Sequence, residues 1–282
     1  MSRFEISRLS VSGASGEENE SSPARLKDID LNLSPGEWVT VVGVNGSGKT
    51  TLARILAGLT VEGATGFINR GFAGSRPAPY VMQQPDAQLF GETPREEIIF
   101  ALEWLQYPAE SITDKADSVL EMTGLMPVAD FPWERLSGGQ RQLAAIAAAT
   151  AGEVPLLVFD EATSMLDDES RLRVHGMASE LQKRGTAVVW VTQRLDELER
   201  SSRIVALTDG KIVFDGRSEH FLYGDLPSGN LADLPKETPC EECGLRLPYL
   251  ASLAIEMYRN GQLQPPFPVS MAEWRKALDL DD

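Results

Sequence analysis

The stretch "EWVTVVGVNGSGKTTLARILAG", residues 37–58, combines an apolar run, a glycine-rich turn and the start of a helix. The run over 37–43 is apolar rather than alternating, which is typical of a strand buried on both faces of a parallel sheet. Residues 43–50 match G-x-x-x-x-G-K-[ST], placed after a strand and before a helix as a phosphate-binding loop requires. A plain glycine turn with a surface lysine is the disfavoured alternative.

The phosphate loop predicts roles for single residues. Lys49 would reach the β and γ phosphates of a nucleotide, and the Thr50 hydroxyl would bind Mg²⁺. The following helix presents its positive N-terminal end to the same anion and is expected to end at Gly58. The residues expected to bind nucleotide are Gly43, Val44, Asn45, Gly46, Ser47, Gly48, Lys49, Thr50 and Thr51.

Two further apolar runs, "PLLVFD" (155–160) and "TAVVWVT" (186–192), predict neighbouring buried strands. A helical pattern follows each run, so the expected class is α/β with right-handed crossovers. Ligands bind such sheets at the carboxyl ends of the strands. Asp160 would therefore hold Mg²⁺ through water, and Glu161 would polarise the attacking water. Without the phosphate loop, two acids ending a strand would equally suit a solvated strand end.

Charge and composition exclude several functions. The 282-residue chain carries a net charge of −16, which argues against a nucleic-acid partner because clustered Lys and Arg bind phosphate backbones. Its apolar stretches fall short of the roughly 18 residues of a membrane-spanning helix. The first residues lack the apolar run of a signal peptide. We therefore expect a cytoplasmic chain, or one held at a membrane by another subunit.

The cysteines Cys240 and Cys243 lie close together in "PCEECG". A zinc site there would need two more ligands, and His175 and His220 lie in unrelated segments. A reduced pair in a turn is the favoured interpretation, with metal binding as the minor alternative.

A change in composition after residue 225, where Pro and Gly become frequent, predicts two parts of the chain. Residues 1–225 would form the nucleotide-binding domain, and residues 226–282 would form a linker with a helical extension. A helical subdomain is expected at about 84–150. It opens with Thr93 as N-cap, and Glu96 would complete a capping box.

Smaller elements follow from turn residues and periodicity. The polar residues 13–23 predict a surface loop between two early strands. A segment rich in Pro and Gly predicts a linker over 225–244. Amphipathic patterns predict helices within 247–261 and 270–278.

The stretch "LSGGQRQ" (136–142) predicts a second anion-binding helix start. Ser137 and Gln140 form a capping box ahead of the apolar run that follows. Gly138 and Gly139 leave the first backbone N–H groups of that helix bare.

These residues resemble the signature of ABC ATPases, and the resemblance covers residues 3 to about 225. It implies a RecA-like P-loop core with an antiparallel β edge, an inserted helical subdomain and, here, a small helical C-terminal extension. It also implies that Ser137, Gly138, Gly139 and Gln140 act on ATP bound by a partner subunit. Gln83 matches the Q-loop glutamine, which contacts Mg²⁺ and the attacking water. Asp167, in "SMLD", matches the D-loop residue that reaches across the dimer, and residues 210–216 match the closing hairpin.

The stretch "QQPDAQLFGETPREEIIFALEWL" and the tail "GLRLPYLASLAIEMYRNGQLQPPFP" are similar to ATPases of energy-coupling factor (ECF) transporters. The resemblance implies an ATP- and Mg²⁺-dependent ATPase at the cytoplasmic face of the cell membrane. Its partners would be a second ATPase subunit, a transmembrane coupling subunit and a substrate-capturing membrane subunit. The cargo would be a vitamin or a metal ion. A groove near Gln83 and the helical insert would receive the coupling helix.

Two positions depart from the family pattern. Near Gly13 the family usually has an aromatic residue that stacks on adenine, so we expect weaker or less base-selective nucleotide binding unless Phe4 or a partner residue substitutes. Gln193, in "VTQRLDEL", takes the position of the switch histidine and is a catalytic candidate together with Glu161 and Gln83. Glutamine keeps a neutral N–H donor but gains no positive charge. Arg194 is not expected to replace that charge, since neighbouring strand residues point to opposite faces.

We therefore expect a slow site in this chain and an intact signature that completes a competent site on a partner, which favours a heterodimer over a homodimer. An ATP-binding switch with little hydrolysis and a non-transport ABC ATPase remain as alternatives. Glu161 argues against the first, and the charge of −16 argues against the second.

Overall fold

The computed structural model describes residues 2–13, 25–83, 89–225 and 237–278. Within these residues, a six-stranded sheet has the order β5-β6-β7-β3-β8-β9. All its neighbouring pairs are parallel except β8 and β9, which form the predicted hairpin. The strands are β3 (Trp38–Gly43), β5 (Tyr80–Val81), β6 (Leu156–Asp160), β7 (Ala187–Val191), β8 (Arg203–Thr208) and β9 (Lys211–Arg217).

The three predicted core strands are confirmed and lie next to one another as β6, β7 and β3. Every residue of β6 and β7 is buried because helices and a second sheet cover both faces. In the register, Val191 lies opposite both Asp160 and Val41. The carboxyl ends of the three strands therefore meet at one edge.

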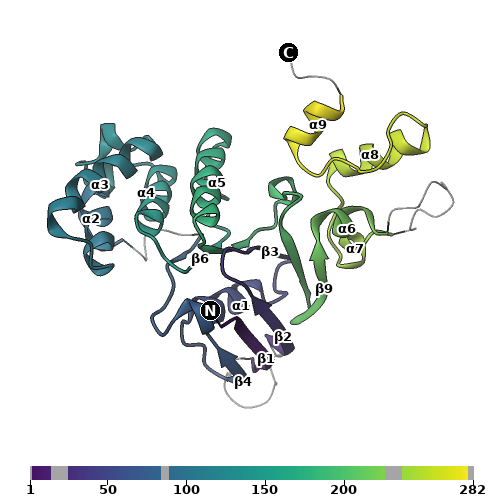
Figure 1. The fold of residues 1–282 in the computed structure, drawn as a ribbon, viewed down its shortest axis with the longest axis horizontal. Coiled ribbons are helices and arrows are strands. Elements are labelled where there is room, and N and C mark those ends of the chain that lie inside the picture. Colours follow the sequence, from purple (N-terminus) through teal and green to yellow (C-terminus); the bar gives the residue numbers. More distant parts are fainter. Residues whose placement is uncertain (1, 14–24, 84–88, 226–236, 279–282) are drawn as a thin grey trace.

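A three-stranded antiparallel sheet, in the order β2-β1-β4, forms the β edge of the fold. It comprises β1 (Phe4–Val11), β2 (Leu26–Leu33) and β4 (Ala64–Asn69), at the bottom of Figure 1. Helix α1 (Lys49–Ala57) shares one hydrophobic core with both sheets and ends at Gly58, as predicted. The loop predicted at 13–23 lies, apart from Gly13, outside the described residues.

The inserted helices gather at the left of Figure 1, where α2 (Pro94–Trp104), α3 (Ala109–Thr123) and α4 (Gly138–Thr150) pack beside α5 (Asp168–Lys183). Thr93 caps α2 by accepting the Glu96 N–H, but the predicted capping box is wrong in its second half. The Glu96 carboxylate accepts the N–H of Glu92 at 2.8 Å instead. Short 3-10 turns occupy Gly71–Ala73, Met126–Val128, Trp133–Arg135 and Leu195–Glu197.

The C-terminal extension packs against the end of the sheet, at the right of Figure 1. After β9 it comprises α6 (Ser218–Tyr223), α7 (Pro239–Glu242), α8 (Tyr249–Arg259) and α9 (Met271–Ala277). The prediction of a plain linker over 225–244 is corrected by α7, whose N-cap Thr238 forms a capping box with Glu241. Cys240 and Cys243 are free, buried thiols, with Cys240 inside this helix and Cys243 at its C-cap. Burial raises the pKa of Cys240 to about 12, which keeps its thiol protonated.

None of the helices in the described ranges has both the length and the apolar character needed to cross a membrane. The division of the chain at residue 225 remains a prediction.

Phe267 tests the packing of the extension, because its fully buried ring contacts the rings of Tyr223 and Tyr258 at 5.1 and 5.2 Å. Phe267→Ala should lower the free energy of unfolding by about 3–5 kcal/mol through lost burial and the cavity left behind. The control Phe67→Ala, at a ring that is 57% exposed, should change it by no more than about 0.5 kcal/mol. Urea unfolding followed by fluorescence measures both, and equal losses would contradict this packing.

Candidate functional site

The phosphate loop joins the end of β3 to the start of α1. Gly43, Gly46 and Gly48 have φ values of 150°, 80° and 104°, the left-handed region that favours glycine. A Cβ at Gly48 would lie 2.6 Å from the Arg25 carbonyl oxygen, and one at Gly43 would lie 2.3 Å from that of Leu207. The backbone can therefore follow this path only with glycine at these positions.

Lys49 is a buried cation inside the loop. Its Nζ donates to the carbonyl oxygens of Gly43 and Val44 at 2.8 and 3.0 Å and lies 3.9 Å from Oε1 of Glu161. Burial lowers the pKa of Lys49, while the carboxylates of Glu161 and Asp160 act in the opposite direction. Lys49, which is predicted to bind phosphate, is therefore held at the edge of the sheet beside Asp160 and Glu161.

Asp160 lies beside this lysine as the last residue of β6. The Tyr80 hydroxyl donates to its Oδ2 at 2.6 Å. Burial raises the pKa of Asp160, against hydrogen bonds from Tyr80 and Thr50 that lower it. Its Oδ1 is buried with no hydrogen-bond partner in the described part of the chain. An unpartnered carboxylate oxygen beside a threonine hydroxyl suits Mg²⁺, which prefers hard oxygen ligands.

Glu161 follows in a conformation that is rare for a residue with a side chain, with a φ of 51°. Its N–H donates to the Val191 carbonyl oxygen at 2.9 Å, which fixes this turn on β7. Such conformations persist where surrounding contacts impose them, and they concentrate at functional sites. The turn brings the side chain of the predicted base between Lys49 and Gln193.

Gln193 connects the base to the phosphate loop. Its Nε2 donates to Oε1 of Glu161 at 2.6 Å and to Oδ1 of Asn45 at 2.7 Å. Because an ionised carboxylate only accepts hydrogen bonds, the amide must turn its NH₂ group toward Glu161. Both amide hydrogens are then engaged, one with the loop and one with the base.

Arg194 directs its charge away from this cluster. Its Nη2 donates to Oδ2 of Asp196 at 2.8 Å, and its Nε lies 3.7 Å from Glu197. These acids raise the pKa of Arg194, with the Asp196 hydrogen bond as the largest cause. The guanidinium thus pairs within its own turn.

Sequence reasoning missed Glu197, whose carboxylate accepts three hydrogen bonds. The donors are the Thr163 hydroxyl at 3.0 Å, the Trp190 indole at 2.9 Å and the Thr192 hydroxyl at 2.8 Å. Glu197 thereby joins the segment after Glu161 to the segment that carries Gln193. An acid four residues beyond Gln193 gave no pattern from which this could be inferred.

Gln142 was also missed, although it stands immediately before the apolar run of α4. It is fully buried, and its Nε2 donates to the carbonyl oxygens of Met82 and Ala162, both at 2.8 Å. The signature helix is thereby tied to the residue before Gln83 and to the residue after Glu161. Gln83 itself is exposed where the chain leaves β5.

The signature forms the N-terminus of α4, apart from the phosphate loop. Its capping box is present: the Ser137 hydroxyl accepts the Gln140 N–H, and the Gln140 side chain accepts the Ser137 N–H. The N–H groups of Gly138 and Gly139 complete the helix start, and a Cβ at Gly138 would meet nothing within 4 Å. This helix start is therefore open to a ligand from outside the chain.

Asp167 is exposed and caps α5. Its carboxylate accepts the Ser170 N–H at 2.8 Å and the Ser170 hydroxyl at 3.1 Å. These bonds lower the pKa of Asp167. The contact of Asp167 across a dimer remains a prediction. The Asp167 carboxylate lies at the surface, where a partner subunit could reach it.

The structure rules out one substitute for the missing adenine-stacking aromatic. Phe4 is fully buried in the core beneath the small sheet, with the Arg70 guanidinium 5.7 Å from its ring centroid. It therefore cannot stack on a nucleotide, and the expectation of weakened adenine binding at Gly13 stays a prediction.

Comparison with known proteins places this geometry in a family. Residues 26–164 match the family model described as ABC transporter. The chain is 32% identical to the energy-coupling factor transporter ATP-binding protein EcfA1 of Oenococcus oeni, over 86% of each chain. It is 35% identical to the protein of that name from Streptococcus thermophilus, over 84% of each chain.

Solved structures show the same fold. The chain resembles cbiO1 of Clostridium perfringens, part of an ABC transporter complex, with a TM-score of 0.63 and 23% identity over 89% of this chain and 97% of that one. It also resembles the dimeric bacterial ABC transporter cassette MJ0796, with a TM-score of 0.64 and 25% identity over 76% of this chain and 98% of that one. The predicted fold class is therefore confirmed.

Tyr80 provides a test of the metal site. Tyr80→Phe removes the hydroxyl that orients Asp160, so the Mg²⁺ concentration giving half-maximal ATPase activity should rise about tenfold, the lower end for lost support of a metal ligand. Tyr249→Phe, at an exposed tyrosine, is the matched control and should leave the Mg²⁺ titration unchanged. Superimposable titrations for both variants would remove Tyr80 from the site.

Proposed function

The chain belongs to the ATP-binding subunits of ABC transporters, in the energy-coupling factor group, and we propose that it powers uptake of a vitamin or a metal ion through separate membrane subunits. ATP hydrolysis in a transporter is the shared activity of this family. The observation that carries the proposal for this chain is the contact of Gln193 with both Asn45 and Glu161. It joins the phosphate loop, the base and the switch position in one cluster.

Each residue of the cluster has a separate role in binding or hydrolysing ATP. Lys49 and the N–H groups of residues 43–51 bind the β and γ phosphates. Thr50, Asp160 and Gln83 would hold Mg²⁺, which would neutralise phosphate charge. Glu161 polarises the attacking water, and Gln193 keeps its hydrogen bond to Glu161 while its second N–H moves from Asn45 to the γ-phosphate. The hydrogen bond from Gln193 to Glu161 at 2.6 Å and the Lys49–Glu161 ion pair at 3.9 Å support this assignment.

A second ATPase subunit completes the arrangement. The open helix start at Ser137–Gln140 and the exposed carboxylate of Asp167 support a contact with nucleotide held by a partner. The relative MJ0796 forms a dimer. Because this chain carries glutamine at the switch position while its signature is intact, we favour a heterodimer with a partner that retains histidine.

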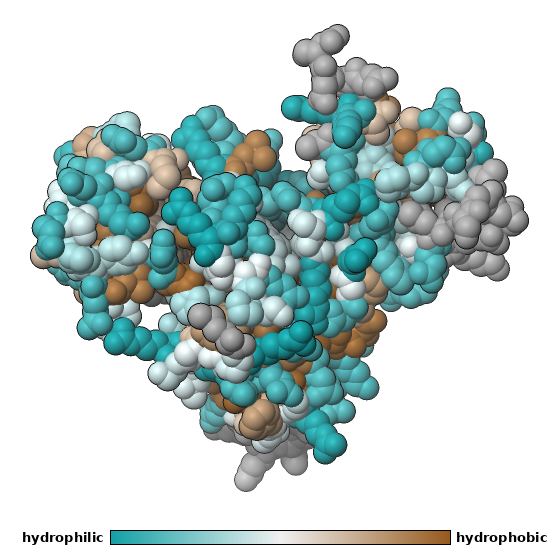
Figure 2. Space-filling model, viewed as in Figure 1, coloured by the Kyte–Doolittle hydropathy of each residue, from teal (hydrophilic) through white to brown (hydrophobic). Residues whose placement is uncertain are grey.

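An exposed aromatic group on and just before α2 supports docking of a membrane subunit. Phe90 and Trp104 are 76% and 72% exposed, and the rings of Phe90 and Phe100 stack at 5.6 Å. Hydrophobic residues reach the surface of the lobe formed by α2, α3 and α4 (Figure 2). Apolar patches of this kind mark interaction sites. Docked there, the chain would lie at the cytoplasmic face of the membrane.

The loop that carries Phe90 is held firmly on the helical subdomain. The buried Glu97 carboxylate accepts the N–H groups of Phe90 and Gly91 at 2.7 and 2.8 Å, and the Trp133 indole donates to the Gly91 carbonyl oxygen at 2.6 Å. A movement of the helical subdomain would therefore carry the aromatic group and the end of the Q-loop with it.

The activity test compares Gln193→His with Glu161→Gln in the assembled complex, and turnover at this chain's site is measured with the partner's own hydrolytic site inactivated. A histidine should raise the turnover of a slow site by about tenfold, less than the 10²–10³-fold effect of losing a whole donor. Glu161→Gln should abolish turnover at this site and transport with it, because the base is gone.

Gln262→His, at an exposed glutamine of the extension, is the matched control and should have no effect on ATPase activity. Unchanged turnover in Gln193→His together with loss of transport in Glu161→Gln would show that the glutamine does not slow this site.

A further inference from the structure

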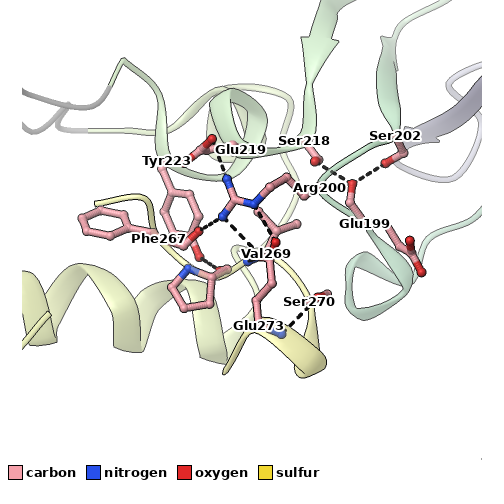
Figure 3. A network of polar contacts seen from close by, with 11 residues as sticks. Glu199, Arg200, Ser202, Ser218, Glu219, Tyr223, Phe267, Val269, Ser270 and Glu273 are labelled. Carbon is pink, nitrogen blue, oxygen red and sulfur yellow. Dashed lines mark hydrogen bonds and ion pairs between the residues drawn. The ribbon is translucent and has the colours of Figure 1, made fainter. Parts of the chain in front are cut away.

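Arg200, seven residues after Gln193, binds acidic side chains from two helices of the C-terminal extension, α6 and α9. Its Nε and Nη2 donate to the two carboxylate oxygens of Glu273 at 2.6 and 3.2 Å, and its Nη1 lies 2.7 Å from Oε2 of Glu219. Nη2 also donates to the Phe267 carbonyl oxygen. Figure 3 shows the guanidinium between Glu219 of α6 and Glu273 of α9.

Glu273 is fixed on its own side of this contact. It accepts the Val269 N–H at 2.7 Å, and its own N–H donates to the Ser270 hydroxyl at 3.3 Å. Burial acts to raise the pKa of Glu273, but the hydrogen bonds from Arg200 and Val269 keep it below its ordinary range. The start of α9 is thus organised around the carboxylate that receives Arg200.

Apolar packing joins the same two regions. Leu195 and Leu198, between Gln193 and Arg200, lie in one hydrophobic cluster with Phe267 and Trp274 of the extension. Val42, immediately before the phosphate loop, belongs to this cluster too. The extension therefore supports the chain from Gln193 to Arg200, which we call the switch segment, by both polar and apolar contacts.

The other side of the switch segment is held by the ATPase core. Glu197 receives hydrogen bonds from Thr163, Trp190 and Thr192. Gln193 lies between Thr192 and the 3-10 turn of Leu195–Glu197, and that turn is followed within three residues by Arg200. The path of the backbone at Gln193 depends on both attachments.

We propose that Arg200 is a positioning residue for ATP hydrolysis, which sets Gln193 against Glu161 by fixing the switch segment on the C-terminal extension. This rests on the catalytic role proposed above for Gln193. The extension then contributes to catalysis, because its contacts with the Arg200 guanidinium fix the position of the C-terminal end of the switch segment.

The geometry requires arginine in particular. The planar fork reaches Glu273 with two nitrogens while the third faces Glu219, and a lysine offers a single ammonium group. Arg200→Lys therefore keeps the charge but loses the two-point contact that fixes orientation.

The test measures kcat and KM for ATP in the assembled complex with the partner's own hydrolytic site inactivated, so that turnover reports the site of this chain. Arg200→Lys, Arg200→Gln and the isosteric Glu273→Gln should each lower kcat by about tenfold, since a small displacement of a reacting group has effects of this order. The KM for ATP should stay within about twofold, because the phosphate loop is untouched. Arg259→Gln, at an exposed ion pair with Glu256 in α8, should change neither.

A double-mutant cycle distinguishes positioning from a structural role. In a Gln193→Ala background, Arg200→Gln should give no further loss of kcat, because the two residues act on one step. A second tenfold loss in that background overturns the proposal, as does unchanged kcat in Glu273→Gln and Arg200→Lys. If Gln193→Ala leaves kcat unchanged, the catalytic role of Gln193 fails as well; if only the Arg200 and Glu273 variants are silent, that role stands.

Discussion

The alignment of three parallel strand ends is the constraint on which the site depends. β6, β7 and β3 end at the same edge, with Val191 opposite both Asp160 and Val41. The three turns that leave these ends therefore bring together the phosphate loop, the adjacent acids and Gln193. Since each strand is buried on both faces, a shift of register would move the buried side chains and is opposed by the whole core.

In the proposed mechanism, the neutral amide of Gln193 takes the role that the resemblance to ABC ATPases assigns to a histidine. Its two donors reach Asn45 and Glu161 in the same arrangement that contains the buried Lys49. A neutral donor adds no charge to this crowded group of one cation and two acids. It also does not titrate near neutral pH, as an imidazole would. Under the proposed function, Gln193 therefore acts through its position rather than through charge, and the backbone contacts that hold it matter most.

Much of the fold could be predicted from the sequence, because its determinants are local. The apolar runs of β3, β6 and β7, the glycines of the phosphate loop and the Ser137–Gln140 capping box each act over a few residues. Contacts across long separations could not be predicted: Tyr80 with Asp160, Gln142 with Met82, and Arg200 with Glu273. Their residue types are common on protein surfaces, and only the tertiary fold makes them partners. Two expectations were wrong for the same reason. Phe4 cannot stack on adenine because it is buried in the core, and Glu96 does not complete the capping box because it accepts the N–H of Glu92.

The central claim is that Gln193, positioned by Glu161 and the extension, contacts the γ-phosphate with the N–H that otherwise donates to Asn45. It is tested most directly by an experimental structure of the assembled complex with Mg²⁺ and a non-hydrolysable ATP analogue. We expect Nε2 of Gln193 at about 3 Å from a γ-phosphate oxygen, the distance of a hydrogen bond. A γ-phosphate contacted by other side chains, with Gln193 turned toward solvent, would contradict the account.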